Sequence, residues 1–455
     1  MNGAPKINNS TTLVLFGATG DLVARKILPA LFKLYDGGFL PEKFRVVGFS
    51  RRDITEAGFH AHIAKMFEKY NGPMVSERWP SFVRLFSHKK GLFENKKDYK
   101  KLGATLKNID KEFGAKTHKL FYLAVSPEMY EPILRNLASS SLAFDKNGNQ
   151  NRGRVLVEKP FGKDLKTARK LDRLLGKLFR EDQIHRIDHY LAKEMIQNIL
   201  SLRFSNNLFE SNWNKKHIEK IEIRAIEHIG VEDRGNLYDS MGALRDFGQN
   251  HLLQMLALIT MDHPEVLDAK SIRKQRAKIL KSLVSPDRDY ISKHTFRAQY
   301  EGYRNIPGVN PESNIETYFR IKAFLKTPRF KGVPIILESG KRLGKSMKDI
   351  TITFKHPNPC LCAGNNHHKN KIIISLEPKE SITINFGSKK PGYGFEIEER
   401  NFGFVLHEDV ASGAGEYEKL LLDCIFGDQT LFTSTEEVRA MWRFIDPIIE
   451  AWGKI

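Results

Sequence analysis

Cysteine is scarce in this sequence, whose 455 residues include only Cys360, Cys362 and Cys424. Three cysteines are too few for a disulfide framework, so a reducing compartment is expected. The sequence also has no run of about 18 uncharged apolar residues, which argues against a membrane-spanning helix. Its first residues, MNGAPKINNSTT, lack the apolar segment of a secretory signal. We therefore expect a cytoplasmic protein with no membrane partner.

Acidic residues are outnumbered, because 54 Asp and Glu stand against 73 Lys and Arg, for a formal net charge of +19. Such a surplus could serve nucleic acid, acidic lipid or anionic small molecules. However, the basic residues are spread along the chain, and their densest clusters, residues 88–101 and 270–281, have helical spacing. This distribution favours a solvated basic surface and no nucleic-acid partner.

The first 186 residues alternate short apolar runs with amphipathic stretches. The strand candidates are residues 11–16, 44–50, 81–86, 119–125 and 154–160. Helix candidates, in which apolar residues recur at helical spacing, are residues 21–34, 55–70, 96–114, 127–140 and 164–179. This alternation predicts a Rossmann-like, doubly wound α/β coenzyme domain with a parallel sheet over residues 1–186.

The pattern changes after residue 186. A helix is expected at residues 190–204, a strand at 220–229 and a long apolar helix at 241–261. Strand candidates then follow one another without helices, at residues 316–324, 333–339, 349–354, 371–377 and 381–386, and helices at 415–426 and 435–452 close the chain. Successive strands usually pair antiparallel, so we expect an α+β domain with a large, mainly antiparallel sheet over residues 187–455.

A glycine turn follows the first strand candidate directly and consists of Gly17, Ala18, Thr19, Gly20, Asp21 and Leu22. Its two glycines let the backbone turn tightly and approach a pyrophosphate, which the N-terminus of the next helix attracts. The spacing is G-x-x-G rather than the full G-x-G-x-x-G, so an ordinary strand-to-helix turn is the alternative.

The second strand candidate ends in Ser50-Arg51-Arg52, where NAD enzymes usually have an acidic residue that accepts the ribose hydroxyls. A guanidinium group suits a 2′-phosphate, so Arg51 favours NADP over NAD as coenzyme. Lys26, one turn inside the first helix candidate, adds a second positive charge. The alternative is a surface arginine pair, which is common in so basic a chain.

Three further segments are distinctive: EKPFG at residues 158–162, RIDHYLAKE at 186–194, and EHIGVEDRG at 227–235, which leads into DFGQNH at 246–251. With GATGDL, they stand in the order found in the glucose-6-phosphate dehydrogenase family, which the sequence resembles over essentially its whole length. The resemblance implies oxidation of D-glucose 6-phosphate at C1 to 6-phospho-D-glucono-1,5-lactone with NADP, the first step of the oxidative pentose phosphate pathway.

The resemblance assigns the catalytic roles to His251 and Asp188. His251 resembles the family's general base, which removes the C1 hydroxyl proton as hydride leaves for the nicotinamide, a task that suits an imidazole. Asp188 resembles the carboxylate that orients this histidine and stabilises its protonated form. Apart from the resemblance, a single histidine in an apolar helix is more often a core residue.

The resemblance places the sugar phosphate at His189, Tyr190 and Lys193. His189 and Lys193 are four residues apart in a helix candidate, so both side chains are expected on one helix face. The family commonly has glycine where this chain has Ala192, and alanine is the better helix former, so we expect the helix to persist.

Further substrate contacts are implied by resemblance at five positions. Glu227 and Asp246 resemble acceptors for sugar hydroxyls, and Lys341 resembles a lysine that reaches the substrate from the large sheet. Lys345 is a second such candidate, although its spacing differs by one residue from the family pattern. Lys159 resembles a lysine at the junction of nicotinamide and substrate, and the next residue is a proline, which permits a cis peptide bond.

The family chemistry needs no metal, so none is expected at the potential ligands Cys360, Cys362, His367 and His368. The family is oligomeric, which implies a homodimer or homotetramer. Three rival functions remain at this point. They are a related sugar-phosphate dehydrogenase with another substrate or with NAD, a nucleic-acid-binding protein on a dehydrogenase scaffold, and a catalytically silent homologue.

Overall fold

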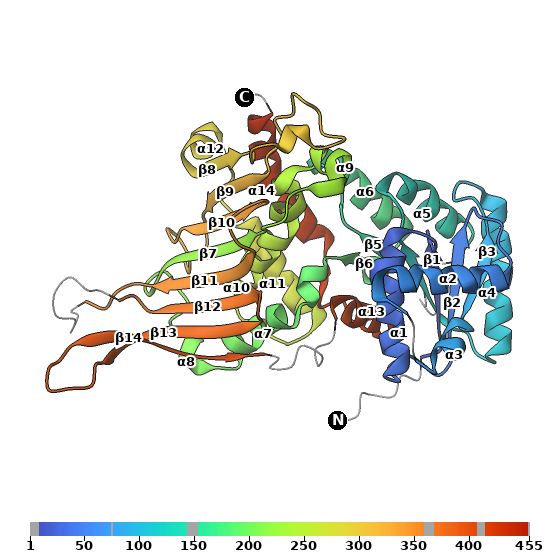
Figure 1. The fold of residues 1–455 in the computed structure, drawn as a ribbon, viewed down its shortest axis with the longest axis horizontal. Helices are drawn as coiled ribbons and strands as arrows, with labels where there is room; N and C mark the ends of the chain where they lie inside the picture. Colours follow the sequence, from blue (N-terminus) through green and yellow to red (C-terminus); the bar gives the residue numbers. More distant parts are fainter. Residues whose placement is uncertain (1–8, 74–75, 143–152, 359–367, 407–414, 454–455) are drawn as a thin grey trace. The chain divides into compact units, whose positions relative to one another are not determined.

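The computed structural model describes residues 9–73, 76–142, 153–358, 368–406 and 415–453. Its chain divides into two compact units (Figure 1). The first unit comprises Met1–Gly162, Lys166–Ala192 and Ala414–Thr435, and the second comprises Lys163–Leu165, Lys193–Gly413 and Glu436–Ile455. Residues 414–435 are therefore grouped with the first unit, whereas the predicted boundary after residue 186 put them in the second domain.

The first unit is built on a seven-stranded sheet. Its strands, in spatial order, are β15 (Phe432–Thr433), β6 (Ile184–Ile187), β5 (Gly153–Glu158), β4 (His118–Leu123), β1 (Thr11–Phe16), β2 (Phe44–Ser50) and β3 (Phe86–Lys90). All neighbours are parallel except β15, which runs antiparallel to β6. The order reverses between β1 and β4, as in doubly wound folds that bind a nucleotide there, so the predicted fold class is confirmed.

Helices connect these strands, and most lie where the periodicity predicts. They are η1 (Val23–Ile27), α1 (Leu28–Asp36), α2 (Glu56–Asn71), α3 (Trp79–Val83), α4 (Lys96–Glu112), η2 (Pro127–Met129), α5 (Tyr130–Ser139), α6 (Leu165–Leu178), η3 (Glu181–Gln183), η4 (His189–Ala192) and α13 (Glu416–Phe426). The strand expected at 81–86 is wrong, because α3 occupies its first half and β3 begins only at Phe86. Pro80 starts α3, and Phe82 is buried with its ring centroid 5.2 Å from that of Phe32.

The second unit is built on an eight-stranded sheet. Its strands, in spatial order, are β14 (Ile397–Val405), β13 (Ser381–Lys389), β12 (Lys371–Glu377), β11 (Met347–Phe354), β7 (Ile218–Ile226), β10 (Ile335–Gly340), β9 (Tyr318–Ala323) and β8 (Thr295–Ala298). Only β7 and β10 pair in parallel, which confirms the predicted large, mainly antiparallel sheet. Neither β8 nor β14 was expected, because neither has a buried alternating pattern.

Helices pack against this second sheet, among them α7, which contacts β12, and η6, which contacts β7 and β10 (Figure 1). The helices of the unit are α7 (Glu194–Phe204), α8 (Asn207–Glu210), η5 (Glu232–Arg234), α9 (Gly235–Asp239), η6 (Leu244–Leu252), α10 (Leu253–Thr260), α11 (Ala269–Lys281), α12 (Arg288–His294), η7 (Tyr303–Asn305) and α14 (Thr435–Trp452). The single helix expected at 241–261 is wrong in its first half, because η6 is a π-helix and only α10 is α-helical.

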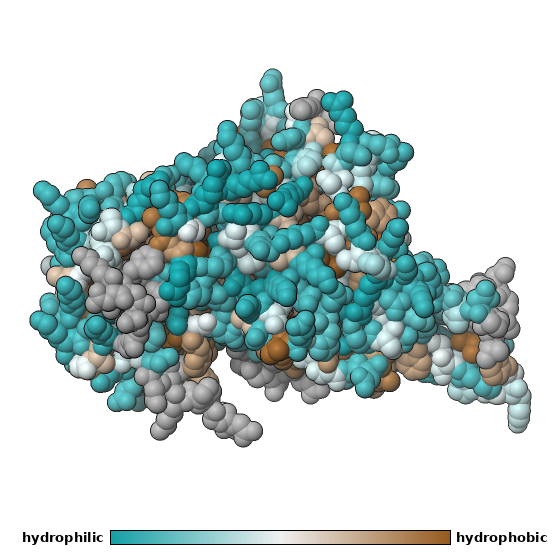
Figure 2. All heavy atoms as spheres, turned by 180° about the vertical axis from the view of Figure 1, so that it is seen from behind, coloured by the Kyte–Doolittle hydropathy of each residue, from teal (hydrophilic) through white to brown (hydrophobic). Residues whose placement is uncertain are grey.

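The surface agrees with the basic, polar composition. Figure 2 shows one face, on which hydrophilic residues predominate and hydrophobic residues form small, scattered patches. Across the described part of the chain, every helix is too short or too polar to cross a membrane.

Candidate active site

The glycine turn at the end of β1 has the geometry of a phosphate-binding loop. Gly17 has φ of +78°, and a Cβ atom there would lie 2.4 Å from the carbonyl oxygen of Ala124, so only glycine fits. The Gly20 N–H donates to the Gly17 carbonyl at 2.8 Å and closes the turn. The turn therefore places backbone atoms and the start of a helix between β1 and β4. The strand order reverses there, and nucleotides bind at this point of the fold.

The helix after the turn begins as the π-helix η1, which carries Lys26 on its exposed side. Asp21, at the start of this helix, accepts hydrogen bonds from the Tyr70 hydroxyl at 2.5 Å and from Arg25 at 3.4 Å. The hydrogen bond from Tyr70 is the main reason why the pKa of Asp21 lies below its usual value. Tyr70 belongs to α2 and Arg25 belongs to η1, so both helices fix the position of the Asp21 carboxylate.

Arg51 follows β2 immediately and lines a pocket of about 550 Å³ in the first unit. The lining is basic, since it also includes Lys89, Lys90 and Lys101, with Asp98 as its single acidic residue. His88 lines it as well, but burial lowers the pKa of its imidazole. The hydroxyl of Ser50, the last residue of β2, lies 2.9 Å from Nε2 of His88. The structure therefore puts a basic hollow where the second strand of a dinucleotide-binding fold meets the adenosine ribose.

Lys159 follows β5, and its peptide bond to Pro160 is cis. The neighbouring carboxylate of Glu158 is buried and accepts a hydrogen bond from the Tyr122 hydroxyl at 2.5 Å. Burial raises the pKa of Glu158 to about 7, although the Tyr122 hydrogen bond and the charge of Lys159 act against this rise. Glu158 is a buried titratable group beside a predicted site residue.

The RIDHYLAKE segment does not form the continuous helix that its spacing predicts. Residues His189–Ala192 form the 3₁₀-helix η4, which begins where the Asp188 carboxylate accepts from the Tyr190 N–H at 3.1 Å. Lys193 then has extended backbone angles, φ −62° and ψ 131°, and precedes α7. The expectation that His189 and Lys193 share one helix face is therefore wrong, because the extended residue separates two helices.

The two sides of this break also belong to different units. Asp188, His189 and Tyr190 lie in the first unit with Lys159 and the glycine turn, whereas Lys193 lies in the second unit. Within the first unit, the His189 ring lies 6.2 Å from the Tyr417 ring of α13, centroid to centroid, in a stacked arrangement.

His251 and Asp246 lie on the π-helix η6 of the second unit. The N-terminus of η6 is held by the buried carboxylate of Glu316, which accepts from the Leu244 N–H at 3.0 Å. His251 is 1% exposed, and its ring centroid lies 5.5 Å from that of Phe247. Wide π-turns are frequent at functional sites, because they change which side chains share a face.

Three lysines and two glutamates gather beside η6 in what we call the lysine–glutamate cluster: Lys193, Glu227, Lys341, Lys348 and Glu377. Glu227 contacts Lys341 directly and lies 3.8 Å from Lys348, while Glu377 lies 2.9 Å from Lys348 and 3.7 Å from Lys193, all measured between charged atoms. The three lysine side chains are only 6%, 12% and 14% exposed for Lys341, Lys348 and Lys193. The cluster is a partly buried charged site of the second unit.

Tyr238 and Asp246 extend this cluster. The Lys341 ammonium lies 5.6 Å from the centre of the buried Tyr238 ring. Burial raises the pKa of Tyr238, and the charges of Asp246 and Glu227 act in the same direction. The structure thus brings together the predicted residues Glu227, Asp246 and Lys341.

Lys345 is a predicted substrate residue that does not take part in the cluster. It lies exposed in the loop between β10 and β11 and forms no ion pair with any described residue. Lys348 and Glu377, in contrast, join the cluster although the sequence singled out neither. Nothing in the sequence marks a lysine at the start of one strand and a glutamate at the end of the next.

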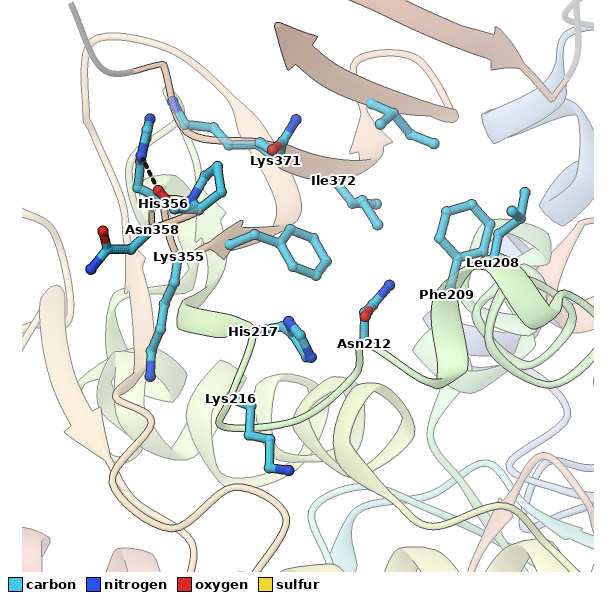
Figure 3. A pocket seen from close by; sticks show the side chains of 14 residues that line it. Leu208, Phe209, Asn212, Lys216, His217, Lys355, His356, Asn358, Lys371 and Ile372 are labelled. Atoms are coloured by element: carbon cyan, nitrogen blue, oxygen red, sulfur yellow. Dashed lines mark hydrogen bonds between the residues drawn. The ribbon is translucent and has the colours of Figure 1, made fainter. Parts of the chain in front are cut away.

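A second pocket, of about 650 Å³, lies away from these residues in the second unit (Figure 3). Its wall combines apolar side chains such as Phe209 and Ile372 with Lys216, His217 and Lys355. It contains no predicted site residue. The potential metal ligands Cys360, Cys362 and His367 lie outside the described residues.

A doubly wound sheet with a glycine turn in one unit, and a buried histidine with a lysine–glutamate cluster in the other, are typical of a nucleotide-binding enzyme. Two family models together match nearly the whole chain. "Glucose-6-phosphate dehydrogenase, NAD binding domain" matches residues 14–198, and "Glucose-6-phosphate dehydrogenase, C-terminal domain" matches residues 200–455. The chain belongs to the glucose-6-phosphate dehydrogenase family, and the resemblance of its motifs is confirmed.

Individual relatives agree. The glucose-6-phosphate 1-dehydrogenase of Chlamydia muridarum is 38% identical over 463 residues, which cover 97% of this chain and 90% of the relative. That of Aggregatibacter actinomycetemcomitans is 39% identical, with 96% and 90% covered. A solved glucose-6-phosphate dehydrogenase in complex with glucose 6-phosphate superimposes with a TM-score of 0.87 at 31% identity, with 98% of this chain and 93% of the other covered. The chain is an oxidoreductase acting on CH–OH donors, and its first unit binds a nicotinamide coenzyme.

Proposed function

We propose that this enzyme oxidises D-glucose 6-phosphate at C1 to 6-phospho-D-glucono-1,5-lactone with NADP as hydride acceptor, the first step of the oxidative pentose phosphate pathway. The lysine–glutamate cluster carries this proposal, because it offers ammonium groups for a phosphate and carboxylates for hydroxyls within one site. A solved member of the family, similar over nearly the whole chain, is a complex with this sugar phosphate.

The chain's own residues handle the proton of the reaction. When bound, the nicotinamide accepts the hydride that leaves C1. As that C–H bond breaks, His251 takes the proton of the C1 hydroxyl, and the C1–O bond becomes the carbonyl of the lactone. Glu227 and Asp246 accept hydrogen bonds from sugar hydroxyls, and Lys341 orients Glu227 through their ion pair. Burial of His251 keeps bulk water from competing for the proton.

The proposal keeps the remaining roles implied by the resemblance. Asp188 is the carboxylate that favours the protonated base, and His189, Tyr190 and Lys193 bind the sugar phosphate. Lys159 contacts both substrate and coenzyme. The turn from Gly17 to Leu22 holds the pyrophosphate, and the tight approach of Gly17 to Ala124 supports this role, because it permits the sharp turn from β1 to the start of the next helix.

Substrate specificity is tested by comparing turnover of glucose 6-phosphate, free glucose and other hexose phosphates with NADP and with NAD. The proposal expects the highest kcat/KM for glucose 6-phosphate with NADP. Comparable kcat/KM for free glucose would contradict the assignment of Lys193 as a phosphate ligand. A higher kcat/KM with NAD would contradict the assignment of NADP as coenzyme.

Arg51 is proposed to read the 2′-phosphate of NADP, with Lys26 as a second positive charge. The cationic lining of the pocket at Arg51 supports this assignment, because a dianion gains charge-assisted hydrogen bonds there. NAD lacks this phosphate, so the two coenzymes differ in the group that Arg51 contacts.

Arg51→Ala should raise KM for NADP by about ten- to hundredfold, the loss expected for a hydrogen bond between charged groups, and should change KM for NAD little. Steady-state kinetics with each coenzyme at saturating sugar phosphate measures the two values. Arg84→Ala is the matched control, because Arg84 is an exposed arginine of the same unit outside this pocket. Equal changes for both coenzymes would show that Arg51 does not distinguish them.

We also propose that the enzyme is a homodimer or homotetramer. Exposed aromatic side chains on β14 support association, since Phe402 and Phe404 are 69% and 51% exposed and lie on the same side of that strand. Light scattering should give two or four times the chain mass, and Phe402→Glu should shift the mass toward that of one chain. The mass of a single chain for the unaltered enzyme would contradict the proposal.

A further inference from the structure

We propose that Lys348 is the second lysine of the sugar-phosphate site, beside Lys193, and that Glu377 is a positioning residue that holds both lysines until the phosphate arrives. This inference rests on the proposed function, because it names how that same site recognises the phosphate. It replaces Lys345, which is exposed and outside the ion pairs of the cluster.

The strand geometry explains why Lys348 reaches the site. Lys348 lies two residues before Ile350 on β11, and alternation along a strand puts both side chains on one face. Ile350 and Ile352 are fully buried, so this is the core face of the sheet. The Lys348 ammonium lies 5.8 Å from the centre of the Phe247 ring, which belongs to the same π-helix as His251.

A β-bulge explains why Glu377 meets Lys348. Between β11 and β12, Asp349 pairs with Ser375 but Lys348 pairs with Glu377, so Leu376 is an additional residue on β12. In a regular pairing without the bulge, Glu377 would lie two residues beyond Ser375, on the same face as Ser375, and would point away from Lys348. Bulges redirect side chains in this way, and this one turns a carboxylate toward the core face.

The charges of the cluster fit a phosphate dianion. Glu377 lies between Lys348, at 2.9 Å, and Lys193, at 3.7 Å, and is the most exposed member of the cluster at 35%. The two ammonium groups both contact the Glu377 carboxylate, and a substrate phosphate can replace this carboxylate as their shared partner. The charges of the two lysines match that of a phosphate dianion, and the exposure of Glu377 leaves the pair accessible to a ligand.

The arrangement gives opposite expectations for the two residues. Lys348→Met keeps the apolar stem over Phe247 but removes the charge, and it should raise KM for glucose 6-phosphate about tenfold or more with little change in kcat. Glu377→Gln removes a negative charge that competes with the phosphate, and it should lower that KM by about three- to tenfold. An unchanged kcat reports an intact site in both variants.

The double variant Lys348→Met/Glu377→Gln distinguishes two roles of Lys348, namely binding of the phosphate and simple neutralisation of Glu377. If Lys348 binds the phosphate, the double variant still has a KM about tenfold above that of Glu377→Gln alone. If Lys348 only neutralises Glu377, the double variant matches Glu377→Gln, and the proposal is overturned. Lys331→Ala, which removes an exposed lysine of the same unit, is the control and should leave KM unchanged.

Inorganic phosphate provides a readout that does not depend on turnover. Its dissociation constant, measured by calorimetry on the full chain, should rise in Lys348→Met and fall in Glu377→Gln, and Lys345→Ala should leave it unchanged. A loss of phosphate binding in Lys345→Ala, with none in Lys348→Met, would overturn the assignment. If phosphate binds as expected but glucose 6-phosphate is not oxidised, the proposed function fails while this inference stands.

Discussion

Replacing His251 by asparagine should lower kcat with glucose 6-phosphate by about two to four orders of magnitude, the usual contribution of a positioned general base. Asparagine has a similar size and stays polar, but it cannot accept the hydroxyl proton in the transition state. KM for the sugar phosphate should change little, because the lysine–glutamate cluster does not include residue 251. Steady-state kinetics at saturating NADP provides both values.

The structure offers a matched control for this variant. His263 follows α10 in the same unit, is exposed and lies outside the proposed site, so His263→Asn should keep the unaltered kcat. Far-ultraviolet circular dichroism compares the helix content of the two variants. A near-normal kcat in His251→Asn would exclude His251 as the base, and loss of helix would point to a structural role of this buried side chain.

Replacing Glu158 by glutamine should remove a loss of stability that the enzyme suffers as the pH rises from about 4.5 to about 7. The pKa of Glu158 is raised from 4.5 to about 7 in the folded protein, chiefly by burial. Within this window the folded state keeps a proton that the unfolded state releases, so the free energy of unfolding falls with increasing pH. The shift corresponds to about 3 kcal/mol, fully expressed above pH 7.

The measurement is the difference in unfolding free energy between Glu158→Gln and the unaltered enzyme, taken by chemical denaturation at several pH values. Relative to the unaltered enzyme, the variant should gain about 3 kcal/mol between pH 4.5 and pH 7.5. Glu77→Gln, which changes an exposed glutamate of the same unit, should show no such trend. A constant difference for Glu158→Gln across this range would mean that folding does not raise the pKa of Glu158.

Local sequence patterns predicted the elements well where burial is uniform. β1, β2, β4 and β5 were predicted within one or two residues, because parallel central strands are apolar runs. Prediction was wrong at residues 81–86, where a short apolar run is shared between a helix that Pro80 starts and the following strand. It also missed β14, an exposed edge strand without an apolar alternation.

The periodicity of apolar residues did not show whether a helix is an α-helix or a π-helix. Residues 241–261 are apolar enough to indicate a helix, but spacing does not show that η6 is a π-helix held by a buried carboxylate from residue 316. Similarly, the interval of four between His189 and Lys193 indicated one helix face. The Asp188 side chain accepts a hydrogen bond at the start of the short 3₁₀-helix, and the extended backbone at Lys193 then separates this helix from α7, so the two side chains do not share a helix face.

The family, the fold class and the reaction follow from the chain's own motifs, because a glycine turn after an apolar strand and the order of RIDHYLAKE, EHIGVEDRG and DFGQNH are local, contiguous patterns. The charged site depended on tertiary structure. Lys348 and Glu377 are 29 positions apart, and they meet only because β11 and β12 pair antiparallel with one additional residue at Leu376. A shift of one residue in strand register reverses the face of every side chain beyond it, and no pattern in either segment records that shift.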